Sequence, residues 1–268
     1  MSEEAGKIEE LDECEVHGLQ KISLVLQRGS PEEGTHMEEH MVEVDPASVV
    51  LDAVHCVQST KVPDLAVRWN CKAGKCGSCS AEVNGQPKLM CMTKLSDYPE
   101  LTEGRSLEIR PLRAFPLLKD LVTDVSWNYE VNKRIRPFKP PTDGQPLIMT
   151  QEEVDRVQEF RKCIECFLCQ GTCHVVRTHG AQEVYAGPRY LVRVASLEMH
   201  PMDQDDRLED VRDDGIGVGY CNITKCCTEV CPESIRITDN AIIPMKERVV
   251  TRYYDPLAIL FRKLFRRK

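Results

Sequence analysis

The 268-residue sequence has no excess of positive charge. It contains 43 acidic and 35 basic residues, which gives a formal net charge of −8. A protein that binds nucleic acid needs clustered Lys and Arg to neutralise phosphates. The composition therefore argues against a nucleic-acid partner.

Long hydrophobic runs are also missing. No apolar stretch approaches the roughly 18 residues that a membrane-spanning helix requires, so we expect the chain not to cross a bilayer. The first residues, Met-Ser-Glu-Glu-Ala-Gly-Lys-Ile-Glu-Glu, are acidic. They resemble neither a secretory signal nor an Arg-rich transit sequence, so we expect no such segment.

The sequence also lacks motifs for substrate chemistry. The sequence contains no Gly-rich dinucleotide fingerprint, no Ser/His/Asp arrangement and no Arg cluster suited to a substrate. Any redox chemistry must therefore belong to bound cofactors, for which the protein supplies ligands and electrostatics. We therefore predict no catalytic residue on this chain.

Cysteine, by contrast, is abundant. The 14 cysteines lie mostly in three tight groups, separated by long stretches without cysteine. Disulfide frameworks usually spread cysteines to connect distant loops, so this grouping favours metal ligation. The cysteines stand at positions 14, 56, 71, 76, 79, 91, 163, 166, 169, 173, 221, 226, 227 and 231.

The first group consists of Cys71, Cys76 and Cys79, followed by Cys91. This C-x4-C-x2-C…C spacing is the plant-type [2Fe–2S] pattern. Glycines at 74 and 77 let the backbone approach the sulfurs, where N–H groups can donate hydrogen bonds. Structural zinc is the rival metal, but it usually uses C-x2-C pairs.

The second and third groups form a reciprocal pair. Residues 163–173 read C-x2-C-x2-C-x3-C, a run in which the fourth cysteine serves a neighbouring cluster. Residues 221–232 read C-x2-Thr-x2-C-x3-C-Pro, with Thr224 where a second ligand would stand. Reciprocity assigns a [4Fe–4S] cluster to Cys163, Cys166, Cys169 and Cys231. It leaves Cys173, Cys221 and Cys227 for a [3Fe–4S] cluster.

Three further cysteines need an interpretation. Cys226 could replace Thr224 as a fourth ligand, which would give a second [4Fe–4S] cluster, but it lies two residues out of register. Cys14 and Cys56 have no partners at ligand spacing and are interpreted as buried or idle thiols. His174 directly follows a predicted ligand, so a position beside the last cluster is considered for it, with Asn222 and Thr224.

The remaining pattern predicts an α+β chain in two domains. Alternating strands at 19–27, 40–44, 80–83 and 106–110, with a helix over 45–58, match a β-grasp plant-type ferredoxin domain. A capping box at Thr150 and Glu153 and a proline-initiated helix at 188–199 indicate a helical two-cluster domain. The acid-rich stretch 203–214 is expected to be solvated. Predicted boundaries are a polar tail at 1–18, domains at 19–115 and 116–245, and a C-terminal tail at 246–268.

The C-terminal tail reverses the charge of the rest. Five of its last seven residues are basic, and apolar residues recur at helical spacing. Such a helix can lie on anionic lipid head groups or pack on a partner subunit. The apolar positions are Leu257, Leu260, Phe261, Leu264 and Phe265.

With these motifs in place, the sequence resembles the iron–sulfur subunits of succinate dehydrogenase and quinol:fumarate reductase from about residue 19 to 244. The three cysteine groups in order, together with Thr224, carry the resemblance. It implies a partner flavoprotein with FAD and a membrane anchor with quinone. Electrons would pass through [2Fe–2S], [4Fe–4S] and [3Fe–4S] in turn. The implied location is the cytoplasmic face of a bacterial inner membrane, or the matrix face of an equivalent one.

The resemblance is weakest on the quinone side. Well-known ubiquinone-linked members have Pro after the ligand matching Cys173, Trp a few residues later, and His after the ligand matching Cys221. This chain has His174, then Arg177 and Thr178, and Asn222. The departures favour a menaquinone-linked enzyme or a differently built anchor.

Two other functions remain as alternatives. One is an iron–sulfur subunit of another flavoenzyme, such as a thiol-linked fumarate reductase or a 2-hydroxy-acid dehydrogenase, although those chains often carry a further cysteine-rich domain. The other is a soluble multi-cluster carrier, which would have no need of a basic, apolar tail.

Overall fold

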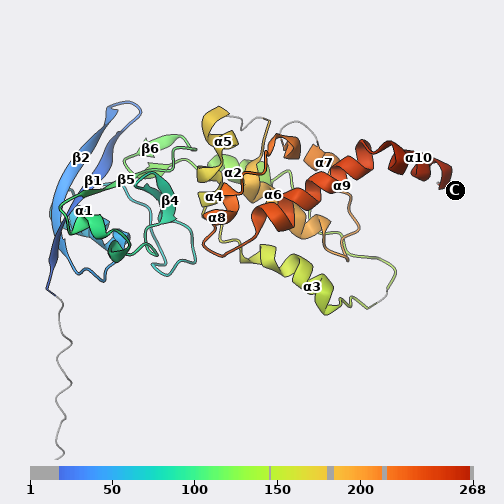
Figure 1. Ribbon diagram of the computed structural model, residues 1–268, viewed down its shortest axis with the longest axis horizontal. Helices are drawn as coiled ribbons and strands as arrows, with labels where there is room; N and C mark the ends of the chain where they lie inside the picture. Colours follow the sequence, from blue (N-terminus) through green and yellow to red (C-terminus); the bar gives the residue numbers. More distant parts are fainter. Residues whose placement is uncertain (1–17, 145, 180–183, 213–215, 266–268) are drawn as a thin grey trace, which may run out of the picture.

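The computed structural model describes residues 18–144, 146–179, 184–212 and 216–265. Two parts lie end to end along the long axis, with α1 and a sheet at one end and most helices at the other (Figure 1). We call residues 20–123 the sheet part and residues 126–265 the helical part. The mixed sheet plus helices confirm the predicted α+β class.

The sheet part contains a five-stranded sheet of order β2-β1-β5-β3-β4. β1 pairs antiparallel with β2 and parallel with β5, while β3 pairs antiparallel with both β4 and β5. One helix, α1 (Val50–Thr60), turns its apolar side inward and buries five of its side chains. The strands are β1 (Gln20–Ser30), β2 (Gly34–Val44), β3 (Ser80–Val83), β4 (Gln86–Leu89) and β5 (Ser106–Arg110).

The predicted strands are all present, and β4 is an additional one. It follows a tight turn at Asn84 and Gly85, which both have positive φ, the backbone that a two-residue hairpin turn favours. β4 is an edge strand, so the missing N–H of Pro87 leaves no ladder bond unmade. This hairpin delivers the chain to Cys91.

A second hairpin corrects the prediction that residues 116–245 are entirely helical. β6 (Leu117–Lys119) and β7 (Val122–Thr123) pair antiparallel and lie against β1. The fully buried Asp120 between them accepts hydrogen bonds from the N–H groups of Gly29 and Ala66 and from the Arg28 guanidinium, each at 2.8 Å. Because a buried carboxylate needs such partners, Asp120 fixes the hairpin to the sheet part.

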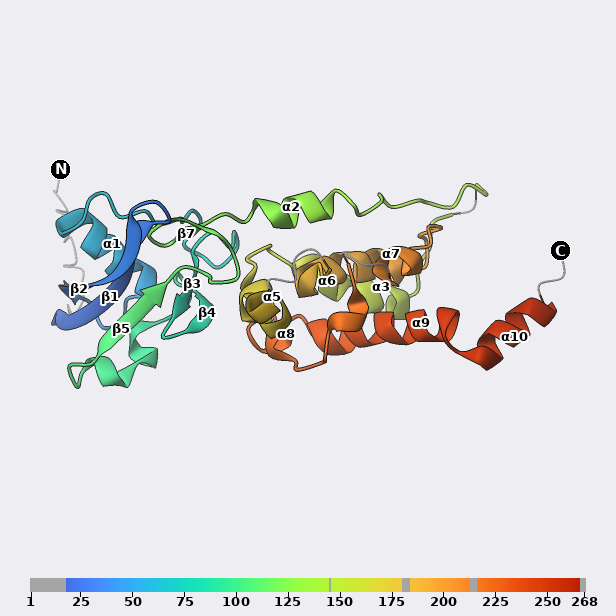
Figure 2. The ribbon, with the colours of Figure 1, turned by 90° about the horizontal axis from the view of Figure 1, so that it is seen from above.

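The helical part begins at α2 (Ser126–Asn132), which lies along one side of it (Figure 2). The Thr150 capping box is confirmed, as is the proline in the first turn of α6. The other helices are α3 (Gln151–Gln158), α4 (Leu168–Thr172), α5 (His174–His179), α6 (Gly187–Glu198), α7 (Leu208–Arg212), α8 (Cys226–Glu229), α9 (Ile243–Tyr253) and α10 (Pro256–Phe265). Short 3₁₀ turns occur at Leu95–Asp97, Pro99–Leu101, Glu159–Lys162 and Val218–Tyr220, and a π-helical turn covers Ile237–Ile242.

The acid-rich stretch is not simply solvated, which corrects a second prediction. Arg207 is 1% exposed and its guanidinium pairs with the equally buried Asp203 carboxylate at 2.7 Å. The same guanidinium donates to the carbonyl oxygens of Arg136 and Pro137 at 2.7 and 2.9 Å. A buried charge is tolerable when paired and hydrogen-bonded in this way, and the pair holds the segment after α2 in place.

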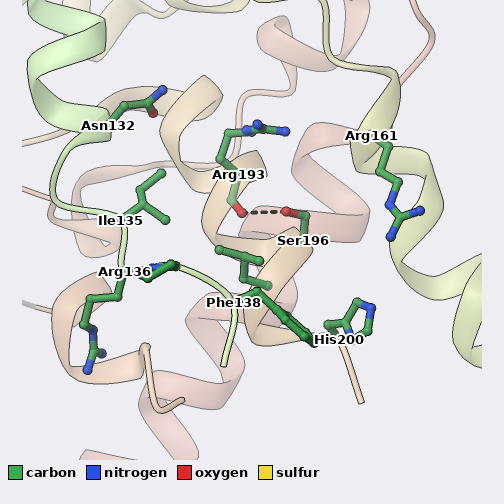
Figure 3. Close-up of a pocket in the computed structure, with 10 residues that line it drawn as sticks. Asn132, Ile135, Arg136, Phe138, Arg161, Arg193, Ser196 and His200 are labelled. Carbon is green, nitrogen blue, oxygen red and sulfur yellow. Dashed lines mark hydrogen bonds between the residues drawn. The ribbon is translucent and has the colours of Figure 1, made fainter. Parts of the chain in front are cut away.

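That segment also lines a hollow on the helical part. Phe138 meets His200 edge to face, with ring centroids 4.9 Å apart, while Arg161 and Arg193 border the hollow (Figure 3). Its lining contains none of the cysteines. The hollow therefore lies where the segment after α2 packs on the helical part, and it is separate from the cysteine groups.

α10 extends the molecule at its C-terminal end (Figure 1). Leu257, Leu260, Phe261 and Leu264 are each more than half exposed. The side chain of Phe265 and residues 266–268 lie outside the described residues. Among the helices that the structure describes, none has both the length and the hydropathy needed to span a membrane.

Candidate iron–sulfur centres

The first cysteine group lies on the loop between α1 and β3. Backbone N–H groups point at its sulfurs: those of Cys71 and Ser78 lie 3.5 Å from Cys76 Sγ, and that of Cys91 lies 3.5 Å from Cys79 Sγ. Gly74 has φ +66°, and a Cβ there would come within 2.9 Å of the Met92 side chain. The structure thus brings Cys91 to the loop and surrounds the thiols with donors that favour thiolates.

Ionisation differs between thiols of this group. Burial opposes charge on Cys76, but hydrogen bonds from Ser78 and from the Cys71 N–H outweigh it and lower its pKa to about 6. Burial raises the pKa of Cys79 to about 12, and the adjacent Cys91 and Cys76 add to the effect. Buried thiols crowded together resist ionisation unless a cation joins them, which suits a metal cluster.

The second group converges from two distant segments. Cys163, Cys166, Cys169 and Cys231 line one cavity, whose other walls are mainly apolar. Burial raises the pKa of Cys166 to about 12, with added repulsion from Cys163 and Cys231. The sequence alone predicted that Cys231 would join residues 163–169, and the structure brings these four thiols together.

Cys173, Cys221 and Cys227 meet beside the second group. Burial raises the pKa of Cys173 and that of Cys227, the latter to about 11, and each of these thiols is close enough to Cys221 to feel its charge. The Thr238 hydroxyl lies 3.4 Å from Cys227 Sγ. Cys226 also lies close enough to Cys173 and Cys227 to raise their pKa values.

The loops of the second and third groups share an unusual backbone. The residues on either side of Cys166 have φ of +58° and +60°, and those on either side of Thr224 have φ of +63° and +64°. Non-glycine residues rarely adopt the left-handed region. Because each loop has two such residues at the same spacing, the two loops can be aligned residue by residue. Thr224 therefore occupies in one loop the backbone position that Cys166 occupies in the other.

The residues predicted beside the last group lie together at the surface. Asn222 Nδ2 is 2.7 Å from His174 Nε2, and Thr224 Oγ1 is 3.5 Å from His174 Nδ1. Cys226 Sγ lies 3.4 Å from Thr224 Oγ1. Asn222 and Thr224 are exposed, so this corner of the third group is open to a partner.

Backbone contact joins the first group to the second. A Cβ on Gly77 would lie 2.6 Å from Cys166 Cα, and the Ser80 hydroxyl donates to the Cys166 carbonyl at 2.8 Å. Lys75 pairs with Glu233 at 3.2 Å across the same boundary. No short-range pattern indicated these contacts, because 86 residues separate Ser80 from Cys166 and 158 separate Lys75 from Glu233.

Among the described residues, no three Cys, His, Asp or Glu side chains converge tightly enough for a single metal ion. Cys56 is half-buried in α1, with its sulfur 4.0 Å from the Glu43 carbonyl. Cys14 lies outside the described residues.

Comparison with known proteins agrees with this arrangement. Residues 22–130 match the model of the 2Fe-2S iron-sulfur cluster binding domain, and residues 159–235 match that of the 4Fe-4S dicluster domain. The chain is 30% identical over 209 residues to the fumarate reductase iron-sulfur subunit of Wolinella succinogenes, covering 75% of this chain and 84% of the relative. The chain belongs to the iron–sulfur subunits of the succinate dehydrogenase and fumarate reductase family.

A solved member of the family is more similar. A chain of the Mycobacterium smegmatis Sdh1 complex in the apo form shares 57% identity and superposes with a TM-score of 0.84, covering 89% of this chain and 99% of that one. An uncharacterized iron-sulfur protein of Methanococcus maripaludis is 30% identical over 224 residues, but this chain spans only 42% of its length. The predicted order, a [2Fe–2S] domain before a [4Fe–4S] dicluster domain, is confirmed.

As an iron–sulfur subunit of this family, the chain is the electron-transfer component of an oxidoreductase. The cysteine groups account for that role without a substrate site. Tyr185 is a residue beside the third group that sequence patterns missed: it is 1% exposed, and burial, together with the nearby Cys221, Cys173 and Cys227, raises its pKa far above the ordinary value. A lone tyrosine between cysteine groups carries no motif.

Proposed function

We propose that this chain is the electron relay of a succinate:quinone oxidoreductase, linking the FAD of a partner flavoprotein to quinone at a membrane anchor. The observation that carries the proposal is the continuity of its thiol groups. Gly77 brings the first group against Cys166, and Cys169 lies close enough to Cys227 for the charges of the two sulfurs to interact. The three groups therefore form an unbroken series through the molecule.

The ligand assignment follows the same grouping. [2Fe–2S] takes Cys71, Cys76, Cys79 and Cys91; [4Fe–4S] takes Cys163, Cys166, Cys169 and Cys231; [3Fe–4S] takes Cys173, Cys221 and Cys227. When bound, these clusters supply one-electron chemistry, while the chain fixes their ligands, hydrogen bonds and exclusion of water. The crowded thiols fit this requirement, because buried sulfurs with raised pKa values need a cation to become thiolates.

The sheet part is proposed to be a β-grasp plant-type ferredoxin domain and the helical part a two-cluster ferredoxin domain. The β6–β7 hairpin moves the proposed boundary from residue 115 to about residue 125, because Asp120 ties the hairpin to β1. The terminal segments 1–18 and 246–268 are proposed as tails, although α9 begins within the helical part and only α10 extends from it.

The open corner at Thr224 supports a direction for the relay. His174, Asn222 and Thr224 face outward beside the third group, where the membrane anchor and its quinone are proposed to lie. Exposed apolar residues of α10, followed by basic residues, support contact with the membrane surface. The chain would then be a peripheral protein on the cytoplasmic face of a bacterial inner membrane.

Low-temperature EPR of the purified complex tests the assignment. We expect the oxidised complex to show one three-iron signal per chain, and the reduced complex to show one [2Fe–2S] signal. Absence of an oxidised three-iron signal would contradict the [3Fe–4S] assignment and would indicate a fourth ligand, such as Cys226.

Affinity purification from detergent-solubilised membranes separates the relay from its rivals. We expect a flavoprotein with FAD and a membrane subunit to co-purify, with succinate reducing the clusters. Recovery of the chain alone would favour a soluble carrier. Recovery with a flavoenzyme that succinate cannot reduce would favour an iron–sulfur subunit of another dehydrogenase.

A further inference from the structure

The hollow beside Phe138 carries positive charge that no acidic side chain balances. Arg161 and Arg193 both line it, and its lining contains no Asp or Glu. In the part of the chain that the structure describes, neither of these two guanidinium groups forms an ion pair. Although the formal net charge of the chain is −8, this surface therefore has a local positive potential.

Arg136, the third arginine at the hollow, differs from the other two. Its guanidinium pairs with the Asp205 carboxylate at 3.1 Å and with the Asp210 carboxylate at 2.9 Å. Figure 3 shows this guanidinium directed away from Arg193. The charge available to a ligand is therefore that of Arg161 and Arg193.

His200 lines the same hollow and supplies a neutral donor. The backbone N–H of Met202 donates to His200 Nδ1 at 3.2 Å, so the neutral ring carries its proton on Nε2. Burial lowers the pKa of His200, and the positive charge of Arg161 lowers it further, while Asp203 opposes the shift. Arg161 is thus close enough to His200 for both to contact one ligand.

Asn132 provides another donor from a different element. Its Oδ1 accepts a hydrogen bond from the Arg189 guanidinium, which leaves the amide NH₂ for a further partner. Asn132 ends α2, Arg161 lies in the 3₁₀ turn before Cys163, and Arg193 lies in α6 (Figure 3). Three elements therefore direct hydrogen-bond donors to one place.

The size and walls of the hollow suit an organic anion. Its volume is about 490 Å³, within the range of roughly 300–1,000 Å³ that is typical of ligand pockets. Ile135, Phe138 and Leu197 give it apolar walls beside the arginines. Such a lining can hold an anionic group and also contact the carbon atoms attached to it.

We propose that this hollow binds a phosphate group through Arg161 and Arg193, with Asn132 and His200 as further donors. The planar fork of an arginine binds phosphate oxygens through paired, charge-assisted hydrogen bonds. Donors that arrive from several directions suit a tetrahedral phosphate better than a planar carboxylate. The phosphate belongs either to a lipid head group or to a soluble phosphate compound. Because no cysteine lines the hollow, the inference does not rest on the cluster assignment.

Two measurements on the purified complex distinguish the sources. Equilibrium dialysis against radiolabelled inorganic phosphate detects a site for soluble phosphate, and phosphorus analysis after solvent extraction of the washed complex detects a retained lipid. Arg161→Gln and Arg193→Gln each remove one charge from the hollow. Arg134→Gln is the matched control, because Arg134 is exposed on the same helical part and does not line the hollow.

We expect each of the two hollow variants to weaken phosphate binding by about tenfold, or to lose the retained lipid phosphorus, while the control matches the wild type. Succinate should not displace the bound phosphate. Absence of a site in both measurements on the wild type, equal binding in all variants, or equal displacement by succinate would overturn the proposal. An unchanged thermal denaturation midpoint shows that a variant is folded, and Arg161→Gln, at an exposed position, decides the question if Arg193→Gln does not assemble.

Discussion

The loops around Cys166 and Thr224 share a backbone and differ in what covers them. Both have a pair of left-handed residues and lead into a short helix, α4 or α8. The Cys166 loop is covered by the sheet part through Gly77 and Ser80, whereas residues 222–225 are exposed. One geometry therefore serves an interior position in the series and also its open end.

The difference in chemistry follows the difference in cover. Where the loop is enclosed, a fourth thiol completes the group; where it is open, a hydroxyl stands in its place beside His174 and Asn222. Cluster type and solvent exposure both influence reduction potential. The comparison indicates that residue identity at a single corner distinguishes the two groups.

Thr224→Cys carries the largest expected effect, because it gives the two loops the same residue at this position. We expect the oxidised three-iron EPR signal to disappear and a [4Fe–4S] signal of lower potential to replace it on reduction. Iron content should rise by one atom per chain. A persisting three-iron signal at wild-type intensity would show that the shared backbone is not enough to place a ligand.

Gly77→Ala tests the cover of the Cys166 loop. The new Cβ would lie 2.6 Å from Cys166 Cα. Gly85→Ala is the control, because it has a similar φ of +76° but nothing within 4 Å of the new atom. Overpacking typically costs about 1–3 kcal/mol, so we expect Gly77→Ala to be destabilised by about that much more than the control.

Thermal denaturation of the purified complexes measures this difference as a lower midpoint for Gly77→Ala. Weaker magnetic interaction between the reduced first and second clusters should accompany it. Equal midpoints for the two variants would mean that the contact between Gly77 and Cys166 can shift without loss of stability.

Cys226→Ser tests the open corner and carries the smallest expected effect. Cys226 Sγ lies 3.4 Å from Thr224 Oγ1, but in the aligned loops Cys226 is one position away from Cys227, the proposed ligand. If it is a bystander, the three-iron signal, its potential and the iron content should match the wild type. Loss of the third cluster in this variant would make Cys226 a ligand.

Much of how the cysteines group in the candidate site could be predicted because they follow fixed spacing. The register that places Thr224 opposite Cys166, and the crossing of Cys231 to residues 163–169, depend only on local repeats. Tyr185 and the contact of Gly77 with Cys166 could not be predicted, since they join segments far apart in sequence.

The fold shows the same division between local and distant information. Strands and caps with local patterns were predicted, and the Asn84-Gly85 turn gave a local signal for β4 that the prediction did not use. The buried pair of Asp203 and Arg207 and the hairpin held by Asp120 were not predicted. Asp203 and Arg207 are only four residues apart, but Arg207 also donates to the Arg136 carbonyl 71 residues away, and Asp120 meets Arg28 92 residues away. Composition presents such charges only as polar surface.

The short connection between the sheet part and the helical part affects how the two parts contact each other. Only residues 124 and 125 separate the β6–β7 hairpin from α2, and the segment after α2 is held by Arg207. Docking of the first loop on Cys166 is therefore an intramolecular event at high effective concentration. Such a contact needs little energy of its own, which explains how Gly77, the Ser80 hydroxyl and the Lys75–Glu233 ion pair can set the position of two cofactors.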